Sequence, residues 1–407
     1  MEARRAAEAV ARDSYGRLVA YLASRSRDVA AAEDALGEAF LAALETWPRD
    51  GVPGRPEAWM LTVARRRLID GARRARVRSE AASTLRLASL AAEGPADASP
   101  FPDERLKLLF ACAHPAIDIG ARTALMLQAV LGLDAARIAS AFLVAPATLG
   151  QRLVRAKAKI RDAGIPLEVP EPDELPGRLG PVLEAIYAAY GTAWDDLAGA
   201  DPRRKGLAEE ATRLARLVVQ LLPDEPEARG LLALVIHCEA RREARRAPEG
   251  RYVPLSEQDV SLWSRPMIEE AERELAEAAT RGRIGRFQLE AAIQSVHAQR
   301  AATSVTAWGE VALLYEELTR LAPTPGSLVG RAAALANVQG PAAGLAALDA
   351  FAPGSVASYQ PYWAVRAHLL AELGSREEAC RAYRRAIGLS GDEPVRDFLE
   401  ERSRSLA

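Results

Sequence analysis

Residues 58–78 read AWMLTVARRRLIDGARRARVR, an apolar stretch that runs into seven arginines and a single acid. Ala, Leu and Arg favour helix, so the stretch predicts a helix that starts near Pro56, where proline suits the first turn. Apolar side chains from Trp59 to Ile69 supply contacts on one side, and arginines spread over another. Arginines clustered in this way form an electrostatic footprint for phosphates. The alternative to a phosphate-binding helix is a basic helix whose Trp59 packs in the core of the protein.

The same helical bias holds along the rest of the chain. Its 407 residues are 49% hydrophobic and carry a formal net charge of only −2. This length exceeds one compact core, so we expect about two to four domains. β-branched residues never form a sustained alternating run, so no strand is expected. The sequence therefore predicts an all-α protein.

Targeting and redox signals point to the cytoplasm. No run of roughly 20 uncharged apolar residues occurs, so no membrane span is expected. The N-terminal residues MEARRAAEAVARD lack the apolar core of a signal peptide. Cys112, Cys238 and Cys380 lie far apart without metal-like spacing, which favours free thiols in a reducing compartment.

Residues 31–48, AAEDALGEAFLAALETWP, predict an amphipathic helix on the N-terminal side of the arginines. We expect Pro48 to end it. The apolar residues at spacings of three or four are Leu36, Phe40, Leu44 and Trp47. The acids off that face are Glu33, Asp34 and Glu38. An ordinary solvated acidic face is the alternative to a binding surface.

Residues 124–164 predict a helix-turn-helix. A short helix over 135–142 is followed by the turn LVAP and by a helix that starts at Pro146 or Ala147. We expect this last helix to bury Leu149, Leu153, Val154 and Ile160. The residues left for solvent or DNA are Thr148, Gln151, Arg152, Arg155, Lys157 and Lys159. Exposed Thr, Gln and Arg near a helix start suit major-groove reading, although short helices joined by tight turns also occur in plain bundles.

The C-terminal half predicts helical repeats. Residues 360–391 carry small and large residues in the order of one tetratricopeptide unit, and 308–323 and 207–223 resemble helices of others. Such an array offers a groove for a protein or peptide partner, or serves only as a rigid cover. The chain has no HExxH, P-loop or GxSxG motif, and its four histidines are scattered. We expect no enzyme activity, cofactor or metal.

The order of these parts resembles bacterial sigma factors of the extracytoplasmic-function group. AEDALGEAF (32–40) resembles the part of sigma region two that docks on the β′ clamp helices of RNA polymerase. AWMLTVARRRLID (58–70) resembles the part that recognises and melts the minus-ten element, and the helix-turn-helix resembles region four. RLVRAKAKIRDAGIPLEVP (152–170) resembles the end of region four in a subgroup with a C-terminal tetratricopeptide-like extension.

The resemblance implies a division of the chain and a role for each part. The implied segments are region two over 1–78, a linker over 79–102, region four over 103–164, a Pro-rich linker over 165–177 and the extension over 178–407. The implied minus-ten contacts are Trp59, Arg65, Arg66, Arg67, Arg73 and Arg74. The implied minus-thirty-five contacts are Thr148, Gln151, Arg152, Arg155 and Lys157. The implied polymerase contacts are Glu33, Asp34 and Glu38.

The resemblance also implies partners and a location. The partners are core RNA polymerase, through its β′ clamp helices and β flap, and promoter DNA, with the protein cytoplasmic and associated with the nucleoid. Gly37 and Arg66 stand where the family often has Gln and Asn. Two other functions remain open: a helix-turn-helix regulator that does not bind polymerase, and a repeat scaffold with degenerate sigma domains.

Overall fold

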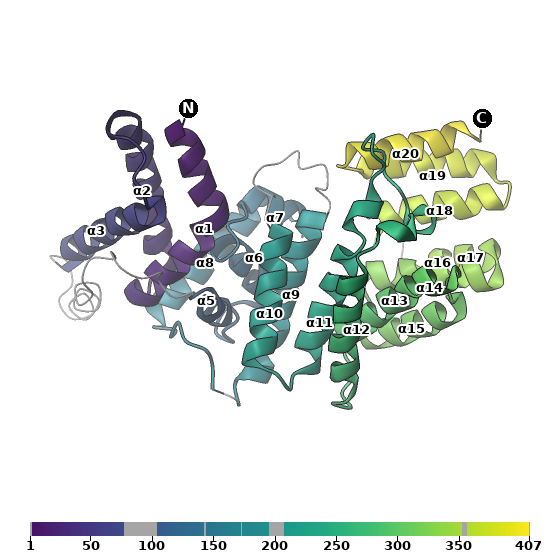
Figure 1. Cartoon of the computed structure of the whole chain (residues 1–407), viewed down its shortest axis with the longest axis horizontal. Coiled ribbons are helices and arrows are strands. Elements are labelled where there is room, and N and C mark those ends of the chain that lie inside the picture. Colours follow the sequence, from purple (N-terminus) through teal and green to yellow (C-terminus); the bar gives the residue numbers. More distant parts are fainter. Residues whose placement is uncertain are drawn as a thin grey trace. The chain divides into compact units, whose positions relative to one another are not determined.

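The computed structural model describes residues 2–76, 104–141, 144–171, 173–194, 207–351 and 356–406. Within these ranges the regular elements are helices, apart from one isolated bridge between Arg246 and Tyr252, which confirms the all-α prediction (Figure 1). The expected linker over 79–102 lies outside the described residues.

The chain forms two compact units. The first comprises residues 1–194 and 199–214, and the second comprises 195–198 and 215–407. The helices of the first unit are α1 (Glu2–Ser26), α2 (Val29–Asp50), α3 (Pro56–Arg76), α5 (Arg105–Cys112), α6 (Ile119–Ala129), α7 (Ala135–Ala141), α8 (Pro146–Asp162), α9 (Leu175–Trp194) and the first half of α10 (Leu207–Leu221).

The second unit contains the rest of α10 and the helices that follow it. These are α11 (Pro226–Glu239), α12 (Arg265–Ala279), α13 (Arg286–Ala298), α14 (Arg300–Thr303), α15 (Trp308–Leu321), α16 (Pro325–Gln339), α17 (Pro341–Asp349), α18 (Gln360–Glu372), α19 (Arg376–Leu389) and α20 (Glu393–Arg404). Short 3-10 turns at Arg242–Arg245, Leu255–Glu257 and Val260–Leu262 interrupt the segment between α11 and α12. The expected functional divisions at 164 and 178 remain a prediction.

Helices α1, α2 and α3 pack around one apolar core. Leu18 and Leu22 of α1, Leu36 of α2 and Met60 of α3 are fully buried in it. Glu57 in the first turn of α3 accepts hydrogen bonds from Ser14 and, at 2.7 Å, from Arg17 of α1. These contacts fix the start of the arginine-rich helix against α1.

The course of α2 differs from the prediction at its C-terminal end. The helix continues through Pro48 to Asp50 and is ended by Gly51, which has a φ of 86°. A proline in the last turn removes one backbone hydrogen bond, which the packed helix tolerates. Leu36 and Trp47 are buried as predicted, whereas Leu44 is 46% exposed. The predicted apolar face is therefore wrong at Leu44.

The middle of α1 lies directly against the end of α6. A Cβ added at Gly16 would lie 1.7 Å from the carbonyl oxygen of Val130, so only glycine fits there. The ring of Tyr15 packs on Gly132, which has a φ of 68°. Arg105 of α5, which is 7% exposed, forms an ion pair with Glu210 of α10. The helices of the expected regions two and four thus belong to one compact unit.

Helix α8 starts at Pro146, as the sequence predicted. Leu149, Leu153 and Ile160 are buried, but Val154 is 68% exposed, so its predicted burial is wrong. At 3.6 residues per turn, Val154 lies about 100° from Leu153 and points away from the core. The helix is therefore narrowly amphipathic, with a wide exposed face.

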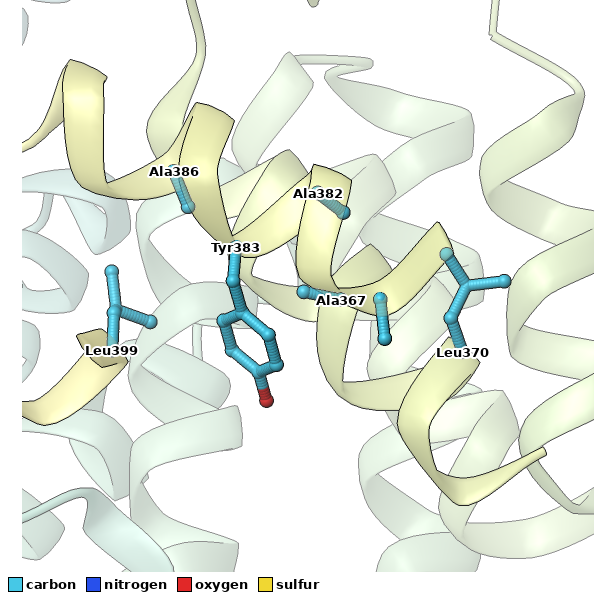
Figure 2. Close-up of a cluster of buried hydrophobic side chains, with 7 residues drawn as sticks. Ala367, Leu370, Ala382, Tyr383, Ala386 and Leu399 are labelled. Carbon is cyan, nitrogen blue, oxygen red and sulfur yellow. The ribbon is translucent and has the colours of Figure 1, made fainter. Parts of the chain in front are cut away.

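The second unit is built from neighbouring helix pairs. Helices α18 and α19 pack side by side across a turn at Gly374, which has a φ of 76°. Ala367 and Leu370 meet Ala379, Ala382 and Tyr383 in the cluster that Figure 2 shows. The small residues predicted for this repeat do lie between its two helices. Helices α15 and α16 form a similar pair.

An irregular segment joins the start of this unit to its end. Arg246 forms an ion pair of 2.6 Å with Asp392, just before α20, and Tyr252 packs edge-on against Phe398 of α20 at 5.5 Å. Arg402 of α20 pairs with Glu257. We refer to residues 242–264 as the connecting segment. It contacts α20, although most of the unit's sequence separates the two.

Polar side chains are buried between α11 and α13. His237 is 2% exposed, and burial together with the nearby Arg241 lowers the pKa of His237 to about 4. Burial also lowers the pKa of His297 to about 4, and its ring packs on Trp308. Arg241 donates a 2.6 Å hydrogen bond to Gln294. The two histidines are therefore neutral packing residues at pH 7.

The contact between α11 and α13 depends on Gly230. A Cβ at this position would lie 2.6 Å from the backbone nitrogen of Gln288, so Gly230→Ala must push the helices apart. We expect Gly230→Ala to lower the free energy of unfolding by about 1–3 kcal/mol in urea denaturation. The control Gly388→Ala meets no atom within 4 Å and should be neutral or stabilising by up to about 1 kcal/mol. Equal stability of the two variants would contradict the packing.

Burial of His237 makes stability depend on pH. Its folded pKa of about 4 lies below the usual 6.5, so the unfolded chain takes up a proton first as the pH falls. Stability is therefore full above pH 6.5 and is lost as the pH drops toward 4. Between pH 7 and pH 5 the free energy of unfolding should fall by about 1–2 kcal/mol less in His237→Leu than in the unmodified protein, as measured by urea denaturation at each pH. An equal loss of stability in His237→Leu and in the unmodified protein over this pH range would contradict the assignment.

Candidate nucleic-acid interface

The arginines of α3 give this helix a basic surface. Arg66, Arg67 and Arg73 are exposed, and Arg65 is half-buried. Arg67 forms a 3.2 Å ion pair with Glu38 of α2, both about half exposed. Exposed guanidinium groups on one helix can contact successive phosphates.

All six predicted minus-ten residues lie on α3, and the structure describes the side chains of five of them. The side chain of the sixth, Arg74, lies outside the described set, although its backbone continues the helix.

Trp59 lies where α3 begins and packs on Trp47 at the end of α2. Their ring centroids are 5.4 Å apart and the planes meet at 65°. Trp47 is 3% exposed, whereas Trp59 remains partly exposed. Trp59 therefore helps to hold the α2–α3 corner and is still partly exposed, on the same helix as the arginines. Sequence reasoning treated core packing and exposure as alternatives, but the structure shows both at once.

The three acids predicted on α2 have different surroundings. Asp34 is exposed, Glu38 is paired with Arg67, and Glu33 forms an ion pair with Lys157 of α8. Burial raises the pKa of Glu33, and Lys157 opposes that rise. Burial and the charges of Glu33 and Asp34 also raise the pKa of Tyr15. Sequence reasoning gave all three acids one role and found neither partner.

Two leucines lie on the exposed face of α2, and the sequence predicted neither of them there. Leu41 is 62% exposed and Leu44 is 46% exposed. Asp34, Glu38, Leu41 and an exposed Glu45 follow at spacings of four, three and four, which places them along one line of the helix. The result is an apolar strip flanked by acids. Only the spacing relative to the acids could have indicated it from the sequence.

Helix α8 presents most of its predicted DNA residues to solvent. Thr148, Gln151 and Arg155 are exposed. Arg152 is half-buried, with a guanidinium nitrogen beside Gly120 at the start of α6. Lys157 is turned away from this face and is only 13% exposed. The predicted set is thus divided between an exposed face and two contacts inside the unit.

A cavity of about 260 Å³ lies between α8 and the start of α6. Three cations line it, and Asp118 is the acid among them. These cations are Arg152, Arg155 and Lys159. This surface is basic enough to hold a phosphate next to the exposed face of α8.

Two other kinds of site are absent from the described ranges. No group of three or more His, Cys, Asp or Glu side chains there is arranged to hold a metal ion. None of the helices in those ranges combines the length and apolar character that crossing a bilayer requires.

Comparisons with known proteins identify the class of the N-terminal helices. Residues 11–78 match Sigma-70 region 2, so the match includes the acids of α2, both tryptophans and the arginines of α3. Residues 178–279 match a family of unknown function (DUF6596). The chain is therefore a sigma-factor-like protein, and its region 2 implies binding to core RNA polymerase and promoter DNA.

A relative without an assigned function is similar to this chain over nearly its whole length. An uncharacterized protein of Rhizobium meliloti (strain 1021) is 38% identical over 369 residues, which cover 89% of this chain and 87% of the relative. The chain belongs to the same family as that protein. No solved structure gives a significant match.

Proposed function

We propose that the protein is a sigma factor of the extracytoplasmic-function group that directs bacterial RNA polymerase to specific promoters. The observation that carries this proposal is the arginine face of α3 within a matched Sigma-70 region 2, next to an acidic and apolar face on α2. One surface suits phosphate, and the other suits a protein partner.

The α2 surface is suited to the β′ clamp helices of polymerase. Leu41 and Leu44 supply apolar area, and Asp34 and Glu38 supply negative charge at its edge. Apolar centres with charged rims are the usual arrangement of protein interfaces. The charged rim sets partner choice and association rate, while the leucines contribute most of the burial.

The α3 surface is suited to the minus-ten element. Arg66 and Arg73 are exposed and extend outward from a helix that Glu57 fixes to α1. The partly exposed Trp59 supplies an aromatic ring on which a displaced base would stack. The arginines would hold the phosphates of a strand that has begun to separate.

Helix α8 is proposed as the reader of the minus-thirty-five element in region four, which also touches the β flap. Gln151 and Arg155 are the exposed residues best suited to base edges. Arg152, Arg155 and Lys159 all line the cavity beside α6, and of these we assign Arg152, which is half-buried, and Lys159, which lies late in the helix, to phosphate. This division assigns Arg152 a positioning contact rather than a reading one.

The second unit is proposed as a tetratricopeptide-like extension that regulates the sigma modules. The α18–α19 pair, with alanines between its helices, supports the repeat assignment. Contacts of the connecting segment with α20 support a rigid body more than an open spiral. A protein or peptide partner of this unit remains a second candidate role.

The two other functional classes predict different results with polymerase. A helix-turn-helix regulator needs no polymerase-binding face, and the Sigma-70 region 2 match favours a sigma factor over it. A scaffold with degenerate sigma domains would bind polymerase without opening promoters. A pull-down with core polymerase separates the helix-turn-helix regulator from the other two classes, and run-off transcription with purified core enzyme separates the sigma factor from the scaffold.

The face of α2 gives the first test. The double variant Asp34→Lys/Leu41→Glu reverses one rim charge and places another in the apolar strip. We expect it to weaken binding to core polymerase at least about tenfold, measured by fluorescence anisotropy, because a buried unpaired charge opposes docking. Asp13→Lys, an exposed charge reversal on α1, is the matched control and should bind normally. Normal binding by the double variant would exclude this face.

The arginine face gives the second test. The double variant Arg66→Ala/Arg73→Ala should lose promoter opening, which permanganate footprinting measures, and should still bind core polymerase. Loss of two phosphate contacts should also reduce the salt dependence of promoter binding by about 1–2 units of log–log slope. The control is Arg5→Ala/Arg12→Ala, at exposed positions of α1. Unchanged opening and slope would remove α3 from the DNA interface.

A further inference from the structure

Helix α19 of the second unit carries a hollow on the side away from its buried residues. The buried side holds Ala382, Tyr383 and Ala386, which Figure 2 shows in the cluster with Leu399 of α20. The hollow on the other side has a volume of about 400 Å³, which is within the usual range of binding sites. The residues that line it are Arg376, Glu377, Cys380, Arg381, Arg384 and Leu406.

The three arginines of this hollow are not neutralised by the residues around them. Within the described part of the chain, the guanidinium groups of Arg376 and Arg384 have no ion pair or hydrogen-bond partner. Arg381 lies 3.6 Å from Glu378, but both side chains are more than half exposed, so the pair contributes little. By contrast, Arg366 of the neighbouring α18 does form an ion pair. The hollow therefore has positive charge available for a ligand.

The positions of these arginines do not favour the helix itself. Arg376 is the first residue of α19, where a cation lies at the positive end of the helix dipole. Arg381 and Arg384 are three residues apart, and like charges at this spacing repel each other on the surface of a helix. Local helix stability therefore does not account for the cluster, whereas a bound anion would relieve both repulsions.

We propose that this hollow is a docking site for a short acidic segment of another protein. Clustered arginines recognise acidic motifs, because a guanidinium group binds a carboxylate through two hydrogen bonds. Leu406 packs against the buried cluster and gives the hollow an apolar edge, which suits a leucine-like side chain among the acids. The inference names the partner chemistry for the peptide-binding role of the second unit, and it rests on that role alone.

The charges around the hollow favour an acidic peptide over DNA. Glu377 lines the hollow, and Glu378 is exposed next to it. Nucleic-acid sites usually form a basic stripe along a whole face, and a DNA backbone that extended past the arginines would meet these acids. A short acidic segment can end before it reaches them. None of the lining residues is fully buried, so the site also suits an exposed peptide better than an enclosed metabolite.

Fluorescence anisotropy on the full chain tests the site with a labelled peptide. The probe is a blocked pentapeptide in which a central leucine is flanked by glutamates, and the control peptide has glutamine in place of each glutamate. We expect the acidic peptide to bind, with an affinity that falls as the salt concentration rises, and the glutamine peptide not to bind. No binding of the acidic peptide up to about 1 mM, or equal binding of both peptides, would overturn the proposal.

Charge reversal locates the binding on α19. Arg376→Glu/Arg384→Glu should weaken binding of the acidic peptide about tenfold or more, because like charges then meet across the site. The matched control Arg265→Glu/Arg273→Glu makes the same charge change at exposed positions of α12 and should bind normally. Circular dichroism and urea unfolding establish that both variants are folded. Equal losses in the two variants would reveal only general electrostatic attraction and would exclude the hollow.

The thiol of Cys380 gives a local measurement that needs no substitution. Cys380 lines the hollow, whereas Cys238 lies on α11 outside it. Alkylation by iodoacetamide, mapped by mass spectrometry on the unmodified protein, should slow at Cys380 when the acidic peptide is bound and stay unchanged at Cys238. Unchanged alkylation of Cys380 at a saturating peptide concentration would show that the peptide binds elsewhere.

A short DNA duplex tests the alternative occupant. Arg376→Glu/Arg384→Glu should bind the duplex as tightly as the unmodified protein does. If this variant loses duplex binding and keeps peptide binding, the hollow is a nucleic-acid surface and the proposal fails. These measurements use neither polymerase nor a promoter, so their failure is distinct from a failure of the sigma-factor function.

Discussion

Close approach of helices through glycine and alanine is the constraint on which this structure depends. With no sheet among the described residues, each core must form where helices touch. Gly16 meets a backbone oxygen of α6, Gly230 meets the backbone of α13, and Gly344 lies against Ala332 and Ala336. At such distances a single methyl group displaces a helix, because protein interiors have no spare volume. The alanine-rich composition therefore sets the geometry of packing as well as favouring helix.

Local regularities of the sequence predicted the elements well. Helix propensity and apolar spacing gave the all-α class, the start of α8 at Pro146 and the alanine-lined pair of α18 and α19. The errors fell at single positions on helices. The sequence predicts that Pro48 ends α2, although the packed helix tolerates a proline in its last turn, and it predicts buried positions for Leu44 and Val154, which are exposed. The polarity of its side chains alone does not show how much of a helix's circumference is covered by neighbouring helices.

Candidate binding residues were less predictable, because their roles depend on partners far away in sequence. The charges of Glu33, Glu38, Arg67 and Lys157 are plain in the sequence, but their pairing is not. Periodicity places a residue on a face of its own helix and says nothing of the helix that covers it. For the same reason the sequence did not predict that Arg152 lies beside α6 or that Trp59 packs on Trp47.

The connecting segment alters how the second unit holds together. In a linear array each helix pair touches only its neighbours, so the ends fray independently of the middle. Here Arg246 reaches Asp392 and Tyr252 reaches Phe398, which ties the beginning of the array to its last helix. Contacts of such long sequence separation slow folding and join distant parts into one cooperative transition. Loss of the final helix would therefore lower the stability of the connecting segment as well, and the second unit is expected to unfold as one body rather than helix by helix.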